Sequence, residues 1–127
     1  MRAFVYDSGA LIAIDRRDSA QFERHLQRLT RRNQVIVPAP VAAQVIRDPR
    51  RQARLMLALR GCDIVPFEAD HVSQVGTLLA RSGTADVVDG FLVLKAVEAE
   101  AAVVTCDPED IGLLLDAMGA RLPVLRP

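Results

Sequence analysis

This chain has few aromatic residues and almost no lysine. Of its 127 residues, four are Phe, one is Tyr and none is Trp, so we expect a core built mainly from Ala, Val, Leu and Ile. The two cysteines, Cys62 and Cys106, lack the spacing of metal ligands, which predicts a pair of buried free thiols in a reducing cytoplasm. No segment approaches the roughly 20 apolar residues that span a bilayer. We therefore expect a cytoplasmic protein of one domain, residues 1–127, without a membrane segment.

Positive charge is concentrated in the first half of the chain and negative charge in the second. Residues 1–60 contain twelve arginines against five acidic residues, whereas residues 61–127 contain four basic residues against eleven acidic ones. Arginine binds phosphate through two parallel hydrogen bonds. A basic half beside an acidic half suits a polyanion that approaches an acidic, metal-loaded site. Two solvated helix faces account for the same pattern equally well.

Short apolar segments alternate with helical patterns along the whole chain. The expected strands are residues 2–6, 34–37, 63–67, 101–105 and 122–125. The expected helices are residues 9–16, 19–32, 40–47, 50–60, 68–81, 86–100 and 108–119. Ser8, Ser19 and Thr84 are the expected N-caps of the first, second and sixth helices. The alternation predicts a three-layer α/β fold, with a central, mostly parallel sheet of about four to five strands and helices on both faces.

The helix expected at residues 19–32 is amphipathic. Apolar residues recur at the spacing of one helix face, and they are Phe22, His25, Leu26 and Leu29. Four arginines are expected on the opposite face, and they are Arg24, Arg28, Arg31 and Arg32. The sequence therefore predicts that the four apolar residues face the core and the arginines face solvent.

Two of the expected strands end in an aspartate. Asp7 follows the first strand, and Asp107 follows the strand at residues 101–105. An aspartate in this place is also a good helix N-cap. In a parallel α/β sheet, however, ligands bind in the crevice at the carboxyl ends of the strands. Because the same design occurs twice, we expect both carboxylates to serve one site.

A second pair of carboxylates opens the helix at residues 86–100. Asp86 and Asp89 lie three residues apart and share one helix face. Both can complement the helix dipole, but Asp89 has core-like neighbours, and a buried carboxylate without a partner is unfavourable. We expect Asp89 to converge with Asp7 and Asp107, and Asp86 to be a further candidate, around one divalent cation. Carboxylate oxygens suit Mg²⁺ or Mn²⁺, and the chemistry that fits is metal-assisted phosphodiester hydrolysis.

Four segments together resemble the motifs of PIN-domain ribonucleases, most closely those of VapC-type toxins of bacterial toxin–antitoxin systems. In chain order they are FVYDSGALIA, VPAPVAAQV, DVVDGFLVLKA and VVTCDPEDI. The resemblance implies an endoribonuclease that depends on Mg²⁺ or Mn²⁺ and hydrolyses RNA. It also implies a homodimer that a small VapB-type antitoxin inhibits.

Carried over by motif, the resemblance assigns a role to each acidic residue. The implied catalytic and metal-binding residues are Asp7, Asp89, Asp107 and Asp86. The implied auxiliary residues are Thr105, Asp110 and Ser8. One position differs from the family's pattern, because this chain has Gln44 where the family usually has Glu. Glutamine keeps a carbonyl acceptor but no charge, so Gln44 either still holds a water at the metal, with weaker affinity, or marks a domain that has lost activity.

The remaining features leave alternatives open. Arg47, Arg50, Arg51 and Arg54 flank the Gln44 helix. They could guide RNA phosphates to the site, and an exposed face or an antitoxin contact is an equal alternative. A phosphorylated receiver domain is excluded, because Asp7 stands alone and the strand at 63–67 ends without Asp. A catalytically weakened PIN-like module that binds RNA or protein remains the alternative to the ribonuclease.

Overall fold

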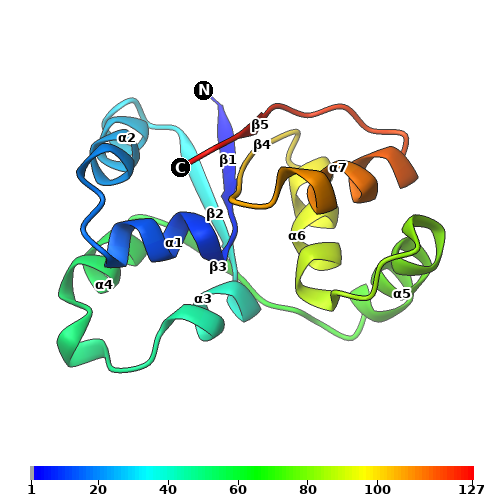
Figure 1. Cartoon of the computed structure of the whole chain (residues 1–127), viewed down its shortest axis with the longest axis horizontal. Helices are drawn as coiled ribbons and strands as arrows, with labels where there is room; N and C mark the ends of the chain where they lie inside the picture. The colour runs from blue at the N-terminus through cyan, green and yellow to red at the C-terminus, as the bar shows by residue number, and fades with distance from the viewer. Residues whose placement is uncertain (1) are drawn as a thin grey trace.

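The computed structural model describes residues 2–127, and five of the described segments form one parallel sheet (Figure 1). The strands are β1 (Ala3–Tyr6), β2 (Gln34–Pro38), β3 (Asp63–Val65), β4 (Ala102–Val104) and β5 (Val124–Leu125). Their order in the sheet is β3-β2-β1-β4-β5, and each neighbouring pair is parallel. The predicted α/β class, with a mostly parallel sheet of four to five strands, is confirmed.

Helices cover both faces of this sheet. They are α1 (Ser8–Asp15), α2 (Ser19–Thr30), α3 (Ala39–Val45), a 3₁₀ helix (Pro49–Arg51), α4 (Ala53–Arg60), α5 (His71–Ser82), α6 (Val87–Glu98) and α7 (Pro108–Ala117). Figure 1 shows α1 to α4 on one side of the strands and α5 to α7 on the other, so the sheet is the middle of three layers. Within residues 2–127, every helix is too short or too polar to cross a bilayer.

The three central strands are apolar on both faces. Val5, Val37 and Val103 are completely buried, as a parallel strand between two helical layers requires. On the α5–α7 side, α6 packs directly on the sheet and its Phe91 and Leu92 are also completely buried. The strand tips are therefore held by a close-packed frame, which positions the residues that follow them.

The strand order creates a crevice between β1 and β4. The chain proceeds from β1 outward to β2 and β3, then crosses to β4 on the other side of β1. Tyr6 at the end of β1 is in register with Val104 at the end of β4. The next residue, Asp7, donates its backbone N–H to the Val104 carbonyl at 3.1 Å. Ligand sites of open α/β sheets form at such a switch point.

Three expected helix caps are wrong. Ser8 and Ser19 are the first residues of α1 and α2, and Thr84 lies outside α6. The caps are Asp7, Asp18 and Asp86, whose carboxylates accept backbone N–H groups of the first helical turn. In each case the aspartate has the charge that interacts favourably with the helix dipole, which a hydroxyl lacks. Two of the predicted site residues, Asp7 and Asp86, therefore also begin helices.

The helix expected at residues 50–60 is divided. The 3₁₀ helix ends at Arg51, and Gln52 has a non-helical backbone conformation before α4 begins. The buried Gln52 side chain accepts the N–H groups of Arg47 and Asp48 at 2.8 and 3.0 Å and donates to Asp15 at 3.1 Å. This side chain therefore closes the loop after α3 against α1.

Candidate metal centre

Asp7 joins the two strand tips that border the crevice. Its side chain is 7% exposed. One carboxylate oxygen accepts the Ala10 N–H at 2.9 Å, and the other accepts the Cys106 N–H at 3.2 Å. The first bond caps α1, and the second ties the end of β1 to the loop that follows β4. A carboxylate fixed by two backbone donors has one orientation, which still leaves lone pairs for a further ligand.

Three carboxylates from two helices come together beside Asp7. Asp89 lies in the first turn of α6, Asp107 is the N-cap of α7, and Asp110 lies in the first turn of α7. Each offers an oxygen, and these oxygens all lie within 4.8 Å of one another. Asp110, expected from the sequence only as an auxiliary acid, is thus one of three residues that could share an ion.

Like charge and burial both act on Asp89. Burial raises the pKa of this half-buried carboxyl most, and repulsion by Asp86, Asp7 and Asp107 raises it further, to about 6. The pKa of Asp110 is also raised, chiefly because its protonated form can hydrogen-bond to Asp107. Carboxylates raise one another's pKa only when they lie close together, so these acids form one cluster.

The loop from β4 to α7 is fixed by local polar contacts. The Thr105 side chain is completely buried, and its hydroxyl accepts the Asp107 N–H at 2.8 Å. Gly9 lets the start of α1 lie close to the loop that contains Cys106. A Cβ atom at residue 9 would lie 2.5 Å from the Sγ atom and 2.7 Å from the Cβ atom of Cys106. The sequence pattern did not reveal this role of Gly9, and the predicted burial of Cys106 is wrong, because this residue is exposed on the loop that follows β4. Both features keep Asp107 near Asp7.

An open cavity of about 690 Å³ lies along α1 beside these acids. Its lining includes Asp7 and Asp107 at one end, and Ser8, Ile12 and Arg16 along the helix. Arg16 is exposed and was not singled out in the sequence, where only its position in an arginine-rich segment could have signalled it. A cation in this place can contact an anion that enters the cavity.

Two further predicted site residues are Gln44 on α3 and Asp86 at the start of α6. Gln44 is exposed on α3, and no hydrogen bond found within residues 2–127 involves its side chain. Asp86 accepts the Asp89 N–H at 3.0 Å and is exposed. The structure therefore brings Asp86 to the edge of the acidic cluster, where its charge acts on Asp89, and leaves the Gln44 side chain exposed on α3.

The four predicted substrate-binding arginines make local contacts. Arg47 donates to the carbonyls of Ala43 and Ile46, and Arg50 and Arg51 form exposed ion pairs with Asp48. Arg54 stacks over the Phe22 ring, 4.7 Å from its centroid. Exposed ion pairs contribute little to stability and exchange readily with other partners.

The donor set fits a hard divalent cation. Asp89, Asp107 and Asp110 supply only oxygen atoms, as Mg²⁺ and Mn²⁺ prefer. The mutual repulsion that raises the pKa of Asp89 is the unfavourable interaction that a bound cation would remove. These three residues would hold the ion, and Asp7 lies beside them with its orientation fixed.

The PIN domain family model matches residues 4–111, from the first residue of the first motif to the last residue of the fourth. The chain belongs to the PIN domain family. PIN domains are generally nucleases, and the predicted family is confirmed. No curated protein matches the sequence.

The fold of this PIN domain also occurs in a solved structure. The chain is similar to one in the crystal structure of VapBC2 from Rickettsia felis bound to a DNA fragment from their promoter. The TM-score is 0.73 at 17% sequence identity, and the match covers 98% of each chain. At this identity the similarity establishes the shared fold.

Proposed function

We propose that this PIN domain is a VapC-type toxin, an endoribonuclease that depends on Mg²⁺ or Mn²⁺. The observation that carries the proposal is the convergence of Asp89, Asp107 and Asp110 within 4.8 Å at the switch point of a PIN-family sheet. The four ordered motifs and the whole-chain similarity to a VapBC2 structure support it.

The residues of this chain have distinct parts in the proposed reaction. Asp89, Asp107 and Asp110 would hold the divalent ion, Asp86 adds charge at the edge, and Asp7 fixes the spacing of the two strand tips. The ion would supply polarisation of the phosphodiester, a lower pKa of the attacking water and compensation of the developing charge. Ser8 and Thr105 help to shape the site as auxiliary residues.

The proposal includes partners and a compartment. The inhibitor is a VapB-type antitoxin, and the active form is a homodimer in the cytoplasm, where RNA is found and the free thiols of Cys62 and Cys106 are stable. RNA approaches over Arg16 and over four arginines between the end of α3 and the first turn of α4, namely Arg47, Arg50, Arg51 and Arg54.

The test is metal-dependent cleavage of purified total RNA, with new 5′ ends mapped by sequencing. Wild type should produce discrete cuts with Mg²⁺ or Mn²⁺ and none with EDTA. Asp89→Asn should remove the cuts. Asp116→Asn is the matched control, because Asp116 is an exposed aspartate at the far end of α7. Absence of cuts from folded wild-type protein with either metal would contradict the proposal.

The second candidate is a catalytically weakened PIN module that binds RNA or protein. The exposed Gln44, without a charge at the position of the usual Glu, favours it. Gln44→Glu discriminates the two candidates. Cleavage that appears only in Gln44→Glu would show a silenced site, whereas equal cleavage by wild type and variant would exclude this alternative.

A further inference from the structure

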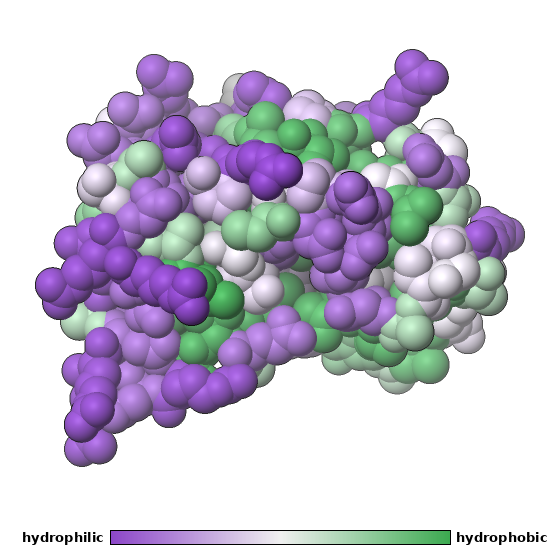
Figure 2. Space-filling model, viewed as in Figure 1, coloured by the Kyte–Doolittle hydropathy of each residue, from purple (hydrophilic) through white to green (hydrophobic). Residues whose placement is uncertain are grey.

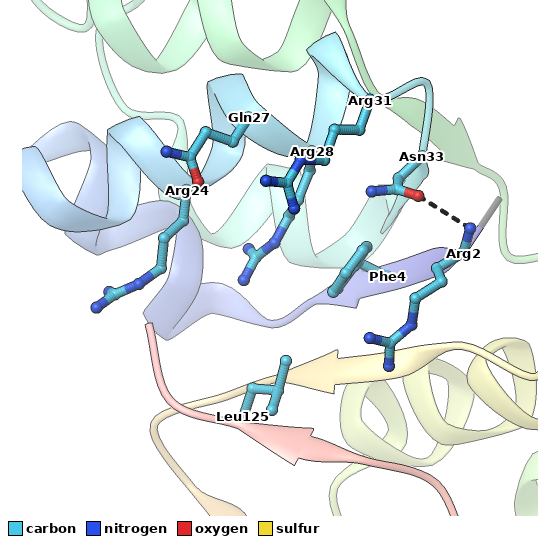
Figure 3. Close-up of a pocket in the computed structure, with 8 residues that line it drawn as sticks. All are labelled: Arg2, Phe4, Arg24, Gln27, Arg28, Arg31, Asn33 and Leu125. Carbon is cyan, nitrogen blue, oxygen red and sulfur yellow. Dashed lines mark hydrogen bonds between the residues drawn. The ribbon is translucent and has the colours of Figure 1, made fainter.

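A second cavity, of about 280 Å³, lies between α2 and the strands on the α1–α4 side of the sheet (Figure 3). We call it the arginine pocket. Its lining residues are Arg2, Phe4, Arg24, Gln27, Arg28, Arg31, Asn33 and Leu125. Figure 3 shows that α2 and the segment after it supply five of these, β1 and the residue before it supply Phe4 and Arg2, and β5 supplies Leu125. The pocket is therefore formed by α2, β1 and β5 together.

The pocket is positively charged and contains no acid. Four arginines line it, and none of the other lining residues is charged. Ion pairs in the part of the chain that the structure describes involve Asp48 and Glu98 as acids, and neither lies at the pocket. Figure 2 shows strongly hydrophilic side chains projecting from the α1–α4 half of the molecule. The four arginines thus have no anionic partner among the described residues.

Arg28 is a buried charged residue at the pocket, unlike the exposed arginines of an ordinary solvated surface. Its side chain is only 9% exposed. Its guanidinium lies 4.5 Å from the Phe4 ring centroid and 5.5 Å from that of Tyr6. Within residues 2–127 its side chain donates one hydrogen bond, to the Tyr6 hydroxyl at 3.0 Å. A buried charge is unfavourable unless it is paired, and the remaining guanidinium donors leave room for an anion.

The shape and chemistry of the pocket favour a nucleotide. Guanidinium groups bind phosphate through two parallel hydrogen bonds. Phe4 and Leu125 add an apolar floor, and the amides of Gln27 and Asn33 can donate and accept. Single-stranded RNA, whose bases stack on rings and guanidinium planes, therefore suits the pocket better than a bare anion does.

The pocket and the acidic site lie along the same flank of the sheet. Phe4 precedes Asp7 by three residues along the chain, a rise of about 10 Å. Leu125 is in register with Val104, which is in register with Tyr6, so these three side chains share the α2 face. The same flank contains the cavity along α1 that Asp7 and Asp107 line. One RNA strand of a few nucleotides spans both places.

We propose that the arginine pocket binds a backbone phosphate of single-stranded RNA adjacent to the segment that reaches the acidic site. The proposal rests on the proposed ribonuclease function. It extends that function by a binding site on β1, α2 and β5 that does not take part in the chemical step.

The test measures binding without cleavage. A labelled single-stranded RNA of twelve nucleotides is titrated with full-length protein in EDTA, and its fluorescence anisotropy is followed at several salt concentrations. The variant is Arg24→Ala/Arg31→Ala, which removes two exposed pocket arginines. We expect about tenfold weaker binding, and a salt dependence whose slope falls by about 0.7 for each phosphate that the variant no longer neutralises.

The matched control is Arg60→Ala/Arg81→Ala, because it removes the same charge from exposed positions on α4 and α5. It should change the dissociation constant less than about twofold. Equal weakening by both double variants would mean that only the overall charge matters, and unchanged binding by the pocket variant would mean that RNA does not enter. Either result overturns the proposal.

Competition separates the possible sources of the anion. Unlabelled RNA should displace the labelled strand at concentrations where uridine monophosphate, inorganic phosphate and a polyglutamate peptide do not. Displacement by any of these three at an equal concentration of anionic groups overturns the proposal. The ribonuclease function fails separately, through absence of cuts when Mn²⁺ is added, while pocket-dependent binding in EDTA still supports the RNA site.

Discussion

The acidic cluster and the arginine pocket each gather charges of one sign, but from different parts of the chain. The cluster joins the first turns of α6 and α7 to the tip of β1, so its members are far apart in sequence. The pocket takes three of its four arginines from α2 and the residue that follows it. At the acidic site, Asp7 is fixed by the backbone N–H groups of Ala10 and Cys106. Arg28 is instead placed by aromatic rings.

The difference shows how each cluster tolerates its own charge. At the acidic site, protonation relieves the repulsion, because the pKa of Asp89 rises to about 6 through burial and neighbouring acids. Arginine cannot lose its proton in a protein, so Arg28 depends on the ring faces of Phe4 and Tyr6 and on the Tyr6 hydroxyl. We therefore expect the first site to respond to pH and cations, and the second to polyanions and salt.

The largest predicted effect separates the two sites by function. Asp107→Asn should lower the rate of RNA cleavage about a thousandfold, because it removes one of three adjacent carboxylate donors. In EDTA the same variant should bind RNA at least as tightly as wild type does, because one repelling charge is gone. Cleavage kinetics and anisotropy on the same preparation measure both quantities. If Asp107→Asn abolished RNA binding as well as cleavage, the acidic site and the arginine pocket would not have separate functions.

The acidic half of this comparison could be predicted from the sequence. Strand-end aspartates and the ordered motifs predicted that Asp7, Asp107 and the helical Asp89 converge, because the carboxyl ends of parallel strands meet at one edge. Hydroxyl caps were expected in place of the aspartates, since the same residue types serve both roles. The contribution of Asp110 depends on how α7 leaves the sheet, which periodicity does not reveal.

The arginine pocket could not be predicted in this way. Periodicity placed Leu26 inward and Arg28 outward, yet Leu26 is 44% exposed and Arg28 is 9% exposed. Those two predictions are wrong because α2 lies over the ring faces of Phe4 and Tyr6, which accept a guanidinium. Which face of an amphipathic helix is inward depends on the side chains opposite, and one sequence does not supply that pairing.

The second prediction concerns the support of the pocket. Tyr6→Phe removes a completely buried hydroxyl that bonds His25 at 2.9 Å and Arg28 at 3.0 Å. Leaving these buried groups unpaired should destabilise the protein by about 2 kcal/mol, and RNA binding should weaken as Arg28 loses its position. Urea denaturation and anisotropy measure the two effects. Thr30→Val is the control, because it removes an exposed hydroxyl of α2. An equal loss of stability in both variants would contradict the role of Tyr6.

The third prediction concerns the support of the acidic site. Gly9→Ala places a methyl group against the Cys106 side chain and should push the Asp107 loop away from Asp7. We expect about tenfold slower cleavage, with pocket-dependent RNA binding unchanged. Gly9→Ala/Cys106→Gly should restore the rate, because it removes both clashing atoms. Gly76→Ala, with no atom within 4 Å of the added carbon, is the neutral control. Failure of the double variant to recover would show that Gly9 matters for another reason.

The smallest predicted effect tests how the acidic site tolerates its own repulsion. Because the folded state holds the Asp89 proton up to a pKa of about 6, against 3.8 for an ordinary aspartate, wild-type stability in EDTA should fall as pH rises between these values. Asp89→Asn should reduce the loss of unfolding free energy over this pH range by about 1 kcal/mol. The effect is small because solvent screens the charge of a half-exposed group. Thermal unfolding from pH 4 to pH 8 measures it, with Asp116→Asn as the matched control. If Asp89→Asn leaves the wild-type slope intact, repulsion around Asp89 does not limit stability. Loss of protons at Asp89 would then not be what distinguishes the acidic site from the arginine pocket.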